Sequence, residues 1–322
     1  MTRYHFLSFA LLAAAAAPGA AQLTFTAIPD QDQSTLQARA TAVTNYVQNY
    51  ISTTCGGDVT VTYNPVTNYQ DAVDALLAGT ADFGWYGGLT GVQAGLRSAP
   101  SVYLTQRVED TEFTSVFIQG AGMDLPQDSL EGVQGKSMAF GSQSSTSGNL
   151  MPQYYLDQAG VTPASSIYTG SHDATVDAVM NGTTEAGALN SVVWYNRVAA
   201  GTIGETSVFY TTPEFVDYLW VAGAGINDTW AGIEGVSSAE GCTDINALLI
   251  DAFLAATNTT ALGLALFEAY STVGYVPITP GEYDPIEETG CQLDLIEEQY
   301  CAVPPPENLG NVGTSTSTST ST

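Results

Sequence analysis

The chain has 322 residues, enough for two lobes with sizeable cores, and its 44% of hydrophobic residues is ordinary for a globular protein. Its charge is strongly acidic: 6 Lys and Arg stand against 33 Asp and Glu, a formal net charge of −27. Such a surface repels nucleic-acid phosphates and anionic lipids, so nucleic-acid binding is excluded.

The first residues predict a secretory signal peptide over residues 1–21. Arg3 precedes the apolar stretch FLSFALLAAAAA, and the small residues Gly19-Ala20-Ala21 come before Gln22. This apolar stretch is too short to span a membrane, and a buried N-terminal helix is the alternative interpretation. We therefore expect an exported protein that is secreted, or periplasmic in a bacterium.

Strands and helices alternate in the first part of the chain. Strands are predicted at Leu23–Ala27, at Val59–Tyr63 and in ADFGWYGG (residues 81–88). One helix is predicted from a capping box formed by Ser34 and Gln37, and a second follows Asn68. This β-α-β-α-β order predicts a largely parallel sheet covered by helices, which is an α/β fold.

The middle of the chain repeats the alternation. Strands are predicted at SMAF (137–140) and EAGAL (185–189), and helices at NLMPQYYLDQAG (149–160), ATVDAVMNG (174–182) and SVVWYNRV (191–198). Extended runs, FTSVFIQ and TSVFYTT, flank this section. Two strands that join two α/β lobes would leave a cleft between the lobes, where ligands usually bind.

The loop between the predicted strand SMAF and its helix contains small polar residues and no Lys or Arg. Ser145, Thr146 and Ser147 offer hydroxyl donors, and Gly148 lets the backbone come close to a ligand. Backbone N–H groups at the start of a helix add a partial positive charge. This pattern favours a cradle for a tetrahedral oxyanion, although a Ser-rich surface loop with an ordinary cap fits the residues equally well.

Three further residues are candidates for the same site. His172 is the only histidine after the signal peptide and precedes a helical pattern, where a structural or capping role is the commoner one. Tyr69 begins a predicted helix, and Tyr86 ends a predicted strand at the carboxyl edge of the sheet. No arrangement of residues indicates catalysis, and no cofactor is expected.

Several segments resemble the phosphonate-type substrate-binding proteins of bacterial ABC importers, and most of all a subgroup described as phosphonate or selenate binders. These segments are AIPDQD, VTNYQDAVDALLAGTADFGWYGGLTGVQA, FGSQSSTSGNLMPQYYLDQAGV, GSHDATVDAVMNG, GALNSVVW, TTPEFVDYLW and GYVPITPGEYDPI. The resemblance runs in order from Leu23 to Glu288. It implies a two-lobe type 2 periplasmic-binding fold with two crossover strands, in which the lobes close on a small ligand.

Position by position, the resemblance implies anion contacts at Tyr69, Tyr86, Ser145, Thr146, Ser147 and His172, and an acidic contact at Asp217. Members that bind an aminoalkyl phosphonate have a second acid near GALNSVVW, where this chain has Val192, so a ligand with an ammonium group is not expected. Because Asp217 can accept a proton from a phosphorus oxyanion but would repel selenate or sulfate, the expected ligand is a phosphonate, phosphite or phosphate.

The resemblance also implies a division of the chain. Lobe 1 takes residues 22–115 and 210–290, lobe 2 takes residues 116–209, and a C-terminal extension follows at 291–303. Residues 304–322, rich in Pro and then in Ser and Thr, are expected to be a disordered stalk with sites for O-glycosylation.

The four cysteines predict two disulfides in an exported chain, and sequence alone allows three connectivities. They are Cys55, Cys242, Cys291 and Cys301; their spacing does not suit a metal site. With the two lobes assigned, we predict a local Cys291–Cys301 bridge in the extension and a Cys55–Cys242 bridge within lobe 1. Asn181, Asn227 and Asn258 begin possible N-glycosylation motifs.

The predicted function is therefore capture of a small oxyanion for uptake, by a monomer that delivers it to a membrane permease or surface receptor. A binder of selenate or another oxyanion is one alternative. A secreted glycoprotein that kept the fold for a surface role is another. An enzyme on the same scaffold, such as a phosphoester hydrolase, would need a metal-ligand set or a nucleophile–base pair that the sequence does not offer.

Overall fold

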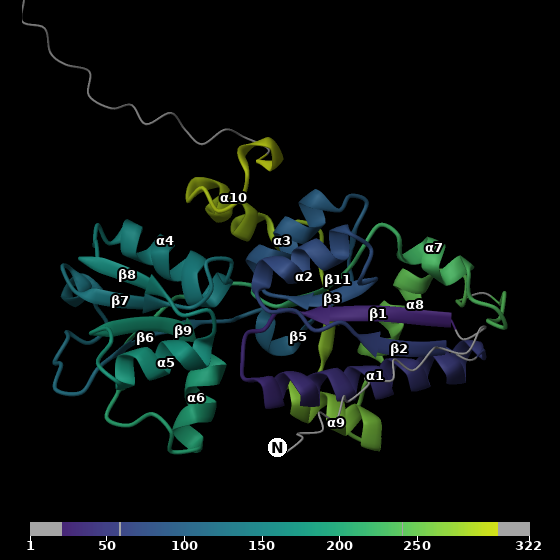
Figure 1. The fold of residues 1–322 in the computed structure, drawn as a ribbon, viewed down its shortest axis with the longest axis horizontal. Helices are drawn as coiled ribbons and strands as arrows, with labels where there is room; N and C mark the ends of the chain where they lie inside the picture. Colours follow the sequence, from purple (N-terminus) through teal and green to yellow (C-terminus); the bar gives the residue numbers. More distant parts are fainter. Residues whose placement is uncertain (1–20, 58, 240, 302–322) are drawn as a thin grey trace, which may run out of the picture.

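The computed structural model describes residues 21–57, 59–239 and 241–301. The predicted signal peptide, apart from Ala21, and the predicted Ser/Thr-rich stalk lie outside the described residues. Two lobes lie side by side, each built on a five-stranded sheet with helices on both faces (Figure 1). The predicted two-lobe α/β architecture is confirmed.

Lobe 1 is built on the sheet β2-β1-β3-β11-β4. Its strands are β1 (Ala21–Ala27), β2 (Val59–Tyr63), β3 (Phe83–Tyr86), β4 (Val102–Tyr103) and β11 (Leu219–Ala222). β1 pairs parallel with β2 and β3, whereas β11 runs antiparallel to β3 and brings the second half of the chain into the sheet.

Helices cover both faces of this sheet. Helices α2 (Tyr69–Leu77) and α3 (Gly88–Arg97) lie above it in Figure 1, and α1 (Gln33–Cys55) and α9 (Ala261–Tyr270) lie below it. The lobe also contains α7 (Ile226–Ala231), α8 (Ile245–Leu254), α10 (Asp284–Gln292) and a two-stranded ribbon of β5 (Thr105–Arg107) and β12 (Tyr275–Pro277).

Lobe 2 is built on the sheet β10-β6-β9-β7-β8. Its strands are β6 (Ser115–Gln119), β7 (Ser137–Phe140), β8 (Ser165–Tyr168), β9 (Ala186–Asn190) and β10 (Ser207–Thr211), and its helices are α4 (Met151–Gln158), α5 (His172–Met180) and α6 (Ser191–Ala199). The extended runs predicted to join the lobes form β6 and β10, which pair antiparallel inside this sheet.

The chain crosses between the lobes at Phe113 and Phe215. These two residues form an antiparallel bridge, in which each backbone N–H donates to the other's carbonyl oxygen at 2.8 and 2.9 Å. Their rings also pack edge to face. The two crossings therefore run side by side and form the connection about which the lobes meet.

Side-chain caps set where the helices begin. Helix α2 is capped by Asn68, as predicted, but the predicted capping box at Ser34 and Gln37 is wrong. Asp32 caps α1 instead, because its carboxylate accepts from the N–H groups of Ser34 and Thr35 and from both of their hydroxyls. These hydrogen bonds lower the pKa of Asp32 to about 2.

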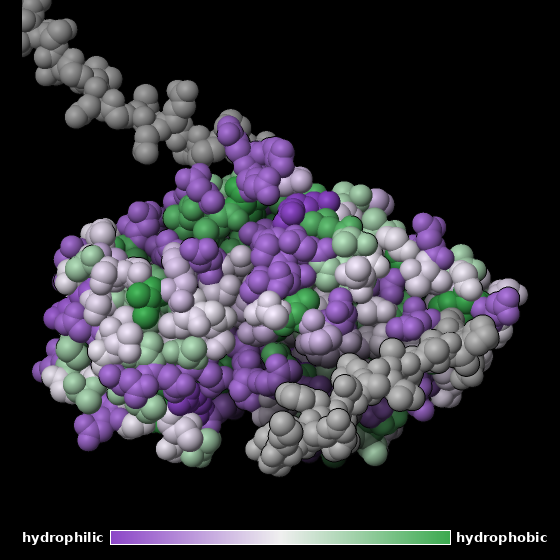
Figure 2. Space-filling view, viewed as in Figure 1, coloured by the Kyte–Doolittle hydropathy of each residue, from purple (hydrophilic) through white to green (hydrophobic). Residues whose placement is uncertain are grey.

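All Lys and Arg side chains in the described part of the chain are ion-paired. Arg39 with Asp30 and Arg107 with Asp110 are buried, while Arg97, Lys136 and Arg197 pair nearer the surface. Hydrophilic residues spread over the face of both lobes that Figure 2 shows. The few cations of this acidic chain are thus already neutralised by neighbouring carboxylates.

Both predicted disulfides are present. Cys55–Cys242 joins the end of α1 to the segment before α8, both in lobe 1. Cys291–Cys301 closes a loop after α10, and because Cys291 lies inside α10, the C-terminal extension continues directly from the last helix of lobe 1. None of the described helices is long and apolar enough to cross a membrane.

Candidate anion-binding site

Six of the seven predicted ligand contacts are buried where the lobes meet. Their side chains belong to residues that are at most 2% exposed: Tyr69, Ser145, Thr146, Ser147, His172 and Asp217. Tyr69 and Asp217 come from lobe 1 or its connection, and the other four come from lobe 2. The closed seam between the lobes is therefore lined by hydroxyl, imidazole and carboxyl groups.

The serine-rich loop forms a tight turn after β7. A single π-helical turn, Thr146–Leu150, precedes α4, and the Oγ of Ser145 accepts the N–H of Gly148 at 3.0 Å. A Cβ on Gly148 would lie 2.9 Å from that Oγ and 3.0 Å from Cε1 of His172, so only glycine fits. The first N–H groups of such a turn have no partner within it, and they provide donors next to the three hydroxyls.

The first turn of α3 faces this loop from lobe 1. The N–H of Leu89 donates to Oγ1 of Thr146 at 2.9 Å, and the N–H of Gly88 donates to Oδ1 of Asp217 at 3.0 Å. The start of α3 and the start of the π-helical turn thus meet at the seam. Two helical N-termini place partial positive charge at one point without any Lys or Arg.

Asp217 is the acidic group of the site. Burial raises its pKa to about 7, although the N–H of Gly88 and the nearby hydroxyls of Ser147 and Thr146 lower it in part. A carboxyl group with such a pKa can accept or donate a proton near neutral pH.

Three buried polar atoms at the seam have no hydrogen-bond partner among the described residues. They are the hydroxyl of Tyr69, Oγ of Ser147 and Oδ2 of Asp217. A buried polar group without a partner costs about 1–3 kcal/mol, and such groups are rare in folded proteins. Two donors and one carboxyl oxygen at the same seam are the partners that a small oxyanion with a proton of its own requires.

His172 is held by hydrogen bonds on both ring nitrogens. The backbone N–H of Asn190 points to Nδ1 at 3.3 Å, so the ring proton belongs on Nε2, which lies 3.2 Å from the hydroxyl of Tyr218. Burial lowers the pKa of His172 to about 4, so the ring is neutral at pH 7. Its backbone N–H donates across the seam to the carbonyl oxygen of Asp30.

Tyr218 and Asn190 lie beside His172 in the candidate site, and sequence reasoning missed both. The Tyr218 hydroxyl accepts from Nδ2 of Asn190 at 2.9 Å and from Nε2 of His172, which leaves its own proton for another acceptor. Two signals were present in the sequence: Tyr218 directly follows Asp217, and Asn190 ends β9 at the carboxyl edge of its sheet.

Tyr86 is not brought to the seam. Side chains alternate along a strand, and Tyr86 points to the face of β3 that α2 covers, where its hydroxyl donates to the carbonyl oxygen of Ala72 at 3.0 Å. The neighbouring Trp85 points to the opposite face and stacks on Tyr218, with ring centroids 5.3 Å apart. A position at the end of a strand did not reveal which face the side chain takes.

Val192, which stands where binders of aminoalkyl phosphonates have a second acid, lies in the first turn of α6. Val192 is partly buried and packs against the apolar core that includes Leu150 and Met151. Its N–H donates to Oδ1 of Asn190, which caps α6. This side chain adds an apolar surface beside the site and no charge.

Comparison with known proteins identifies the family. A family model described as the periplasmic substrate-binding protein of phosphonate ABC transporters matches residues 25–283. The chain belongs to this family. Its members are substrate-binding components of transporters and not enzymes, and they are periplasmic proteins, which agrees with the resemblance found in the sequence.

Individual relatives agree with this assignment. The chain is 40% identical over 207 residues to a probable ABC transporter phosphite-binding protein, PhnD1, of Prochlorococcus marinus, covering 61% of this chain and 68% of that protein. It is 26% identical over 196 residues to the phosphate-import protein PhnD of Mycolicibacterium smegmatis, covering 56% and 59% of the two chains.

Solved structures show the same fold. The structure of Prochlorococcus PhnD1 in complex with methylphosphonate superposes with a TM-score of 0.77 at 32% identity, and the match covers 86% of this chain and 99% of the other. A binding component of a phosphonate transporter from Pseudomonas aeruginosa has a TM-score of 0.68 at 16% identity, covering 87% and 89%.

Proposed function

We propose that this protein captures a small phosphorus oxyanion, namely a phosphonate, phosphite or phosphate, at the seam between its lobes. The observation that carries the proposal is the group of three unpartnered buried atoms on Tyr69, Ser147 and Asp217. Its relatives support this ligand class, since their names refer to phosphite, phosphate and methylphosphonate.

In this proposal, neutral donors hold the anion. The hydroxyls of Ser145, Thr146, Ser147, Tyr69 and Tyr218 donate to its oxygens, and the N–H groups of the π-helical turn add to them. Hydrogen bonds to a charged group contribute roughly 1.5–3 kcal/mol each, against association costs of about 4–15 kcal/mol. About six such bonds total roughly 9–18 kcal/mol, so micromolar binding, which needs about 8 kcal/mol, is attainable without a cation when the association cost lies toward the lower end of its range.

Within this arrangement His172 has a supporting role. Because it is neutral and both ring nitrogens have partners, it contributes no positive charge to the site. It orients the Tyr218 hydroxyl toward the ligand, together with Asn190.

Asp217 distinguishes among anions through a proton. Hydrogen phosphate, hydrogen phosphite and hydrogen phosphonates carry a P–OH group that can donate to an ionised Asp217, whereas selenate and sulfate carry no proton near neutral pH. An ionised carboxylate repels those two ions, because like charges at contact distance in a buried site are strongly unfavourable. Val192, in place of a second acid, leaves an ammonium-bearing substituent without a counter-ion.

Calorimetry tests this ligand class. At about pH 7, where Asp217 is about half ionised and phosphite and methylphosphonate exist in part as monoanions that keep a P–OH group, phosphate, phosphite and methylphosphonate should bind more tightly than selenate. Asp217→Asn should narrow that difference, since the amide no longer repels selenate. Tighter binding of selenate by the parent protein would refute the proposed selection.

We also propose that the protein is exported by its signal peptide, acts as a monomer and delivers its ligand to a membrane permease. The alternative of a surface glycoprotein without a ligand has some support, because Asn181, Asn227 and Asn258 are all exposed. A thermal-shift screen over oxyanions separates the two: stabilisation by a phosphorus oxyanion supports capture, and silence toward every anion supports the surface role.

A further inference from the structure

The last described segment of the chain packs against helix α3 of lobe 1. We call residues 293–301 the C-terminal strap; the Cys291–Cys301 disulfide ties its end back to α10. The matched family region ends at residue 283, so the strap lies outside it. In Figure 1, α10 and the strap lie above the junction of the two lobes, next to α3.

The strap is fixed to α3 by one apolar and one polar contact. Ile296 is 5% exposed and belongs to the same core as Leu89. Both side chains press on Gly290 of α10, where a Cβ would lie 2.7 Å from Ile296 and 3.2 Å from Leu89. Nε2 of Gln93 donates to the carbonyl oxygen of Leu295 at 2.8 Å. The strap therefore restrains both the first and the second turn of α3.

A tight turn brings the strap back onto α10. The N–H groups of Leu295 and Ile296 both donate to the carbonyl oxygen of Gly290, at 2.8 and 3.1 Å. Asp294, just before them, adopts a left-handed conformation with φ of 57°. The Cys291–Cys301 disulfide stabilises this turn, because it limits the other conformations that the strap can adopt.

The turn of α3 that the strap restrains is the one that reaches the anion site. Leu89 packs near Ile296 with its side chain, and its N–H donates to Thr146 in lobe 2. The preceding N–H, from Gly88, donates to Asp217. A displacement of the strap would therefore shift the first turn of α3 and, with it, the hydrogen bonds to Thr146 and Asp217.

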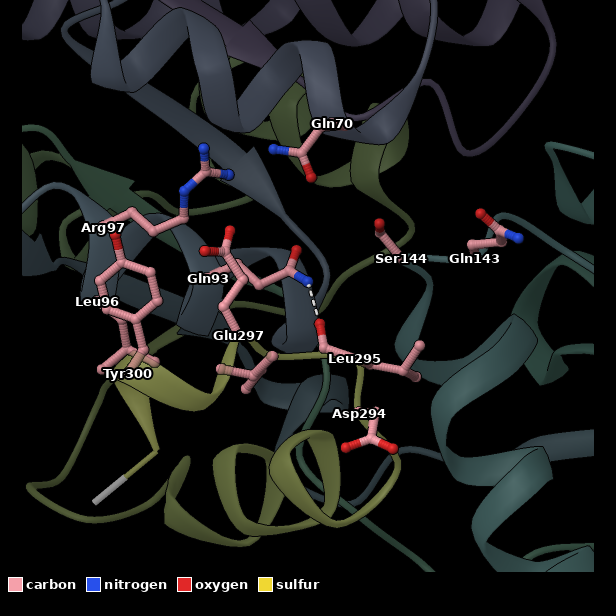
Figure 3. A pocket seen from close by; sticks show the side chains of 11 residues that line it. Gln70, Gln93, Leu96, Arg97, Gln143, Ser144, Asp294, Leu295, Glu297 and Tyr300 are labelled. Carbon is pink, nitrogen blue, oxygen red and sulfur yellow. Dashed lines mark hydrogen bonds between the residues drawn. The ribbon is translucent and has the colours of Figure 1, made fainter. Parts of the chain in front are cut away.

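The strap also reaches toward lobe 2. α10 packs against the π-helical turn Thr146–Leu150, and a pocket of about 240 Å³ lies beside this contact. Figure 3 shows the walls of that pocket: Gln143 and Ser144 from lobe 2, Gln70, Gln93 and Arg97 from lobe 1, and the strap from Asp294 to Tyr300. The strap thus forms one wall of this pocket, and Ser144, which directly precedes Ser145 in the chain, lies on another.

We propose that the C-terminal strap is a positioning element for anion binding: Leu295 and Ile296 hold the first two turns of α3 in the geometry that the closed site requires. The inference rests on the proposed function. Pre-organised donors lower the cost of ordering on binding, and an interface held closed releases its ligand slowly. Loss of the strap therefore acts mainly on the dissociation rate of the anion.

The test compares the two disulfides of the same protein. A Cys291→Ser/Cys301→Ser variant should release methylphosphonate or phosphate about tenfold faster and bind it correspondingly more weakly, because related binding variants differ mostly in dissociation rate. The matched control, Cys55→Ser/Cys242→Ser, opens a disulfide within lobe 1 that ties α1 to the segment before α8. This control should lower the melting temperature more and leave the affinity within about twofold, because a longer closed loop constrains the unfolded chain more.

A second pair of variants covers the case in which a disulfide variant does not fold. Ile296→Ala should weaken anion binding, whereas Ile51→Ala, a fully buried isoleucine in α1, should reduce stability without changing the affinity. Unchanged dissociation rates in both strap variants would overturn the inference. If the parent protein binds no oxyanion at all, the proposed function fails, and the inference about the strap fails with it. If the parent protein binds an oxyanion and the strap variants bind it equally well, only the inference about the strap is overturned.

Discussion

Replacing Asp217 by Asn should change how stability depends on pH. The carboxyl is 1% exposed, one of its oxygens has no partner within the described chain, and burial raises its pKa from 3.8 to about 7. Asn keeps an oxygen that can accept the N–H of Gly88, but it does not ionise. Asp217→Asn therefore removes the ionisable group and retains the size and shape of the side chain.

The direction in which stability changes with pH follows from how tightly the folded and unfolded chains bind the Asp217 proton. Because the folded protein holds this proton more tightly than the unfolded chain, the contribution of Asp217 to stability is greatest at low pH. It falls as pH rises from the unfolded pKa of about 4 to the folded pKa of about 7, and it is level above that. At 1.36 kcal/mol per pKa unit, the full effect is on the order of 4 kcal/mol.

Thermal melts without added oxyanion measure this effect. Between about pH 5 and about pH 7, the stability of Asp217→Asn relative to the parent should rise by roughly 2 kcal/mol. For a chain of this size, that corresponds to about 3 °C in melting temperature. Asp157→Asn, at an exposed position in α4, is the control and should track the parent. Parallel pH curves for Asp217→Asn and the parent would refute the reasoning.

Two matched sets of variants test the remaining geometry. Tyr69→Phe removes an unpartnered hydroxyl at the seam and should weaken anion binding by about 1.5–3 kcal/mol, whereas Tyr86→Phe should leave affinity unchanged and cost roughly 1 kcal/mol of stability, since that hydroxyl bonds to a backbone carbonyl. Calorimetry and urea unfolding separate the two, and equal losses of affinity would contradict the placement of Tyr86. Thr146→Val should weaken binding about tenfold because it removes both the proposed donor to the anion and the acceptor for the Leu89 N–H, while Thr146→Ser keeps both and should bind nearly as the parent does. Similar affinities for the Val and Ser variants would show that this bond between the lobes does not support the closed site.

Local sequence patterns determined the elements of this fold. Alternating and helical apolar spacing located strands such as Val59–Tyr63 and helices such as the one after Asn68, because those periods follow from backbone geometry alone. The cap of α1 was misassigned to Ser34, because Asp32, Ser34 and Thr35 are all competent caps and only the path of the chain selects one. The two linking runs were located correctly as strands β6 and β10, but their antiparallel pairing inside the lobe 2 sheet was not predicted, since pairing partners are not written in a single strand.

The candidate anion cradle was also predicted from the sequence. Small polar residues between a strand and a helix leave backbone N–H groups free, and this property is local to the loop from Phe140 to Leu150. The sequence alone could not decide whether this loop is an oxyanion cradle or a plain surface loop. The opposing turn of α3 lies more than fifty residues before this loop along the chain, and its N–H groups donate to Thr146 and Asp217 in the folded protein.

The sequence by itself predicted the chemical character of the candidate site: neutral hydroxyl donors, one histidine and almost no cations, with Asp217 added by the family resemblance. Only the tertiary structure decided how these groups are used. It turned Tyr86 into the core and Tyr218 toward His172, and it buried Asp217 enough to raise its pKa. The physical reason is that side-chain direction and desolvation depend on which surfaces pack together, and those surfaces belong to segments far apart in the chain.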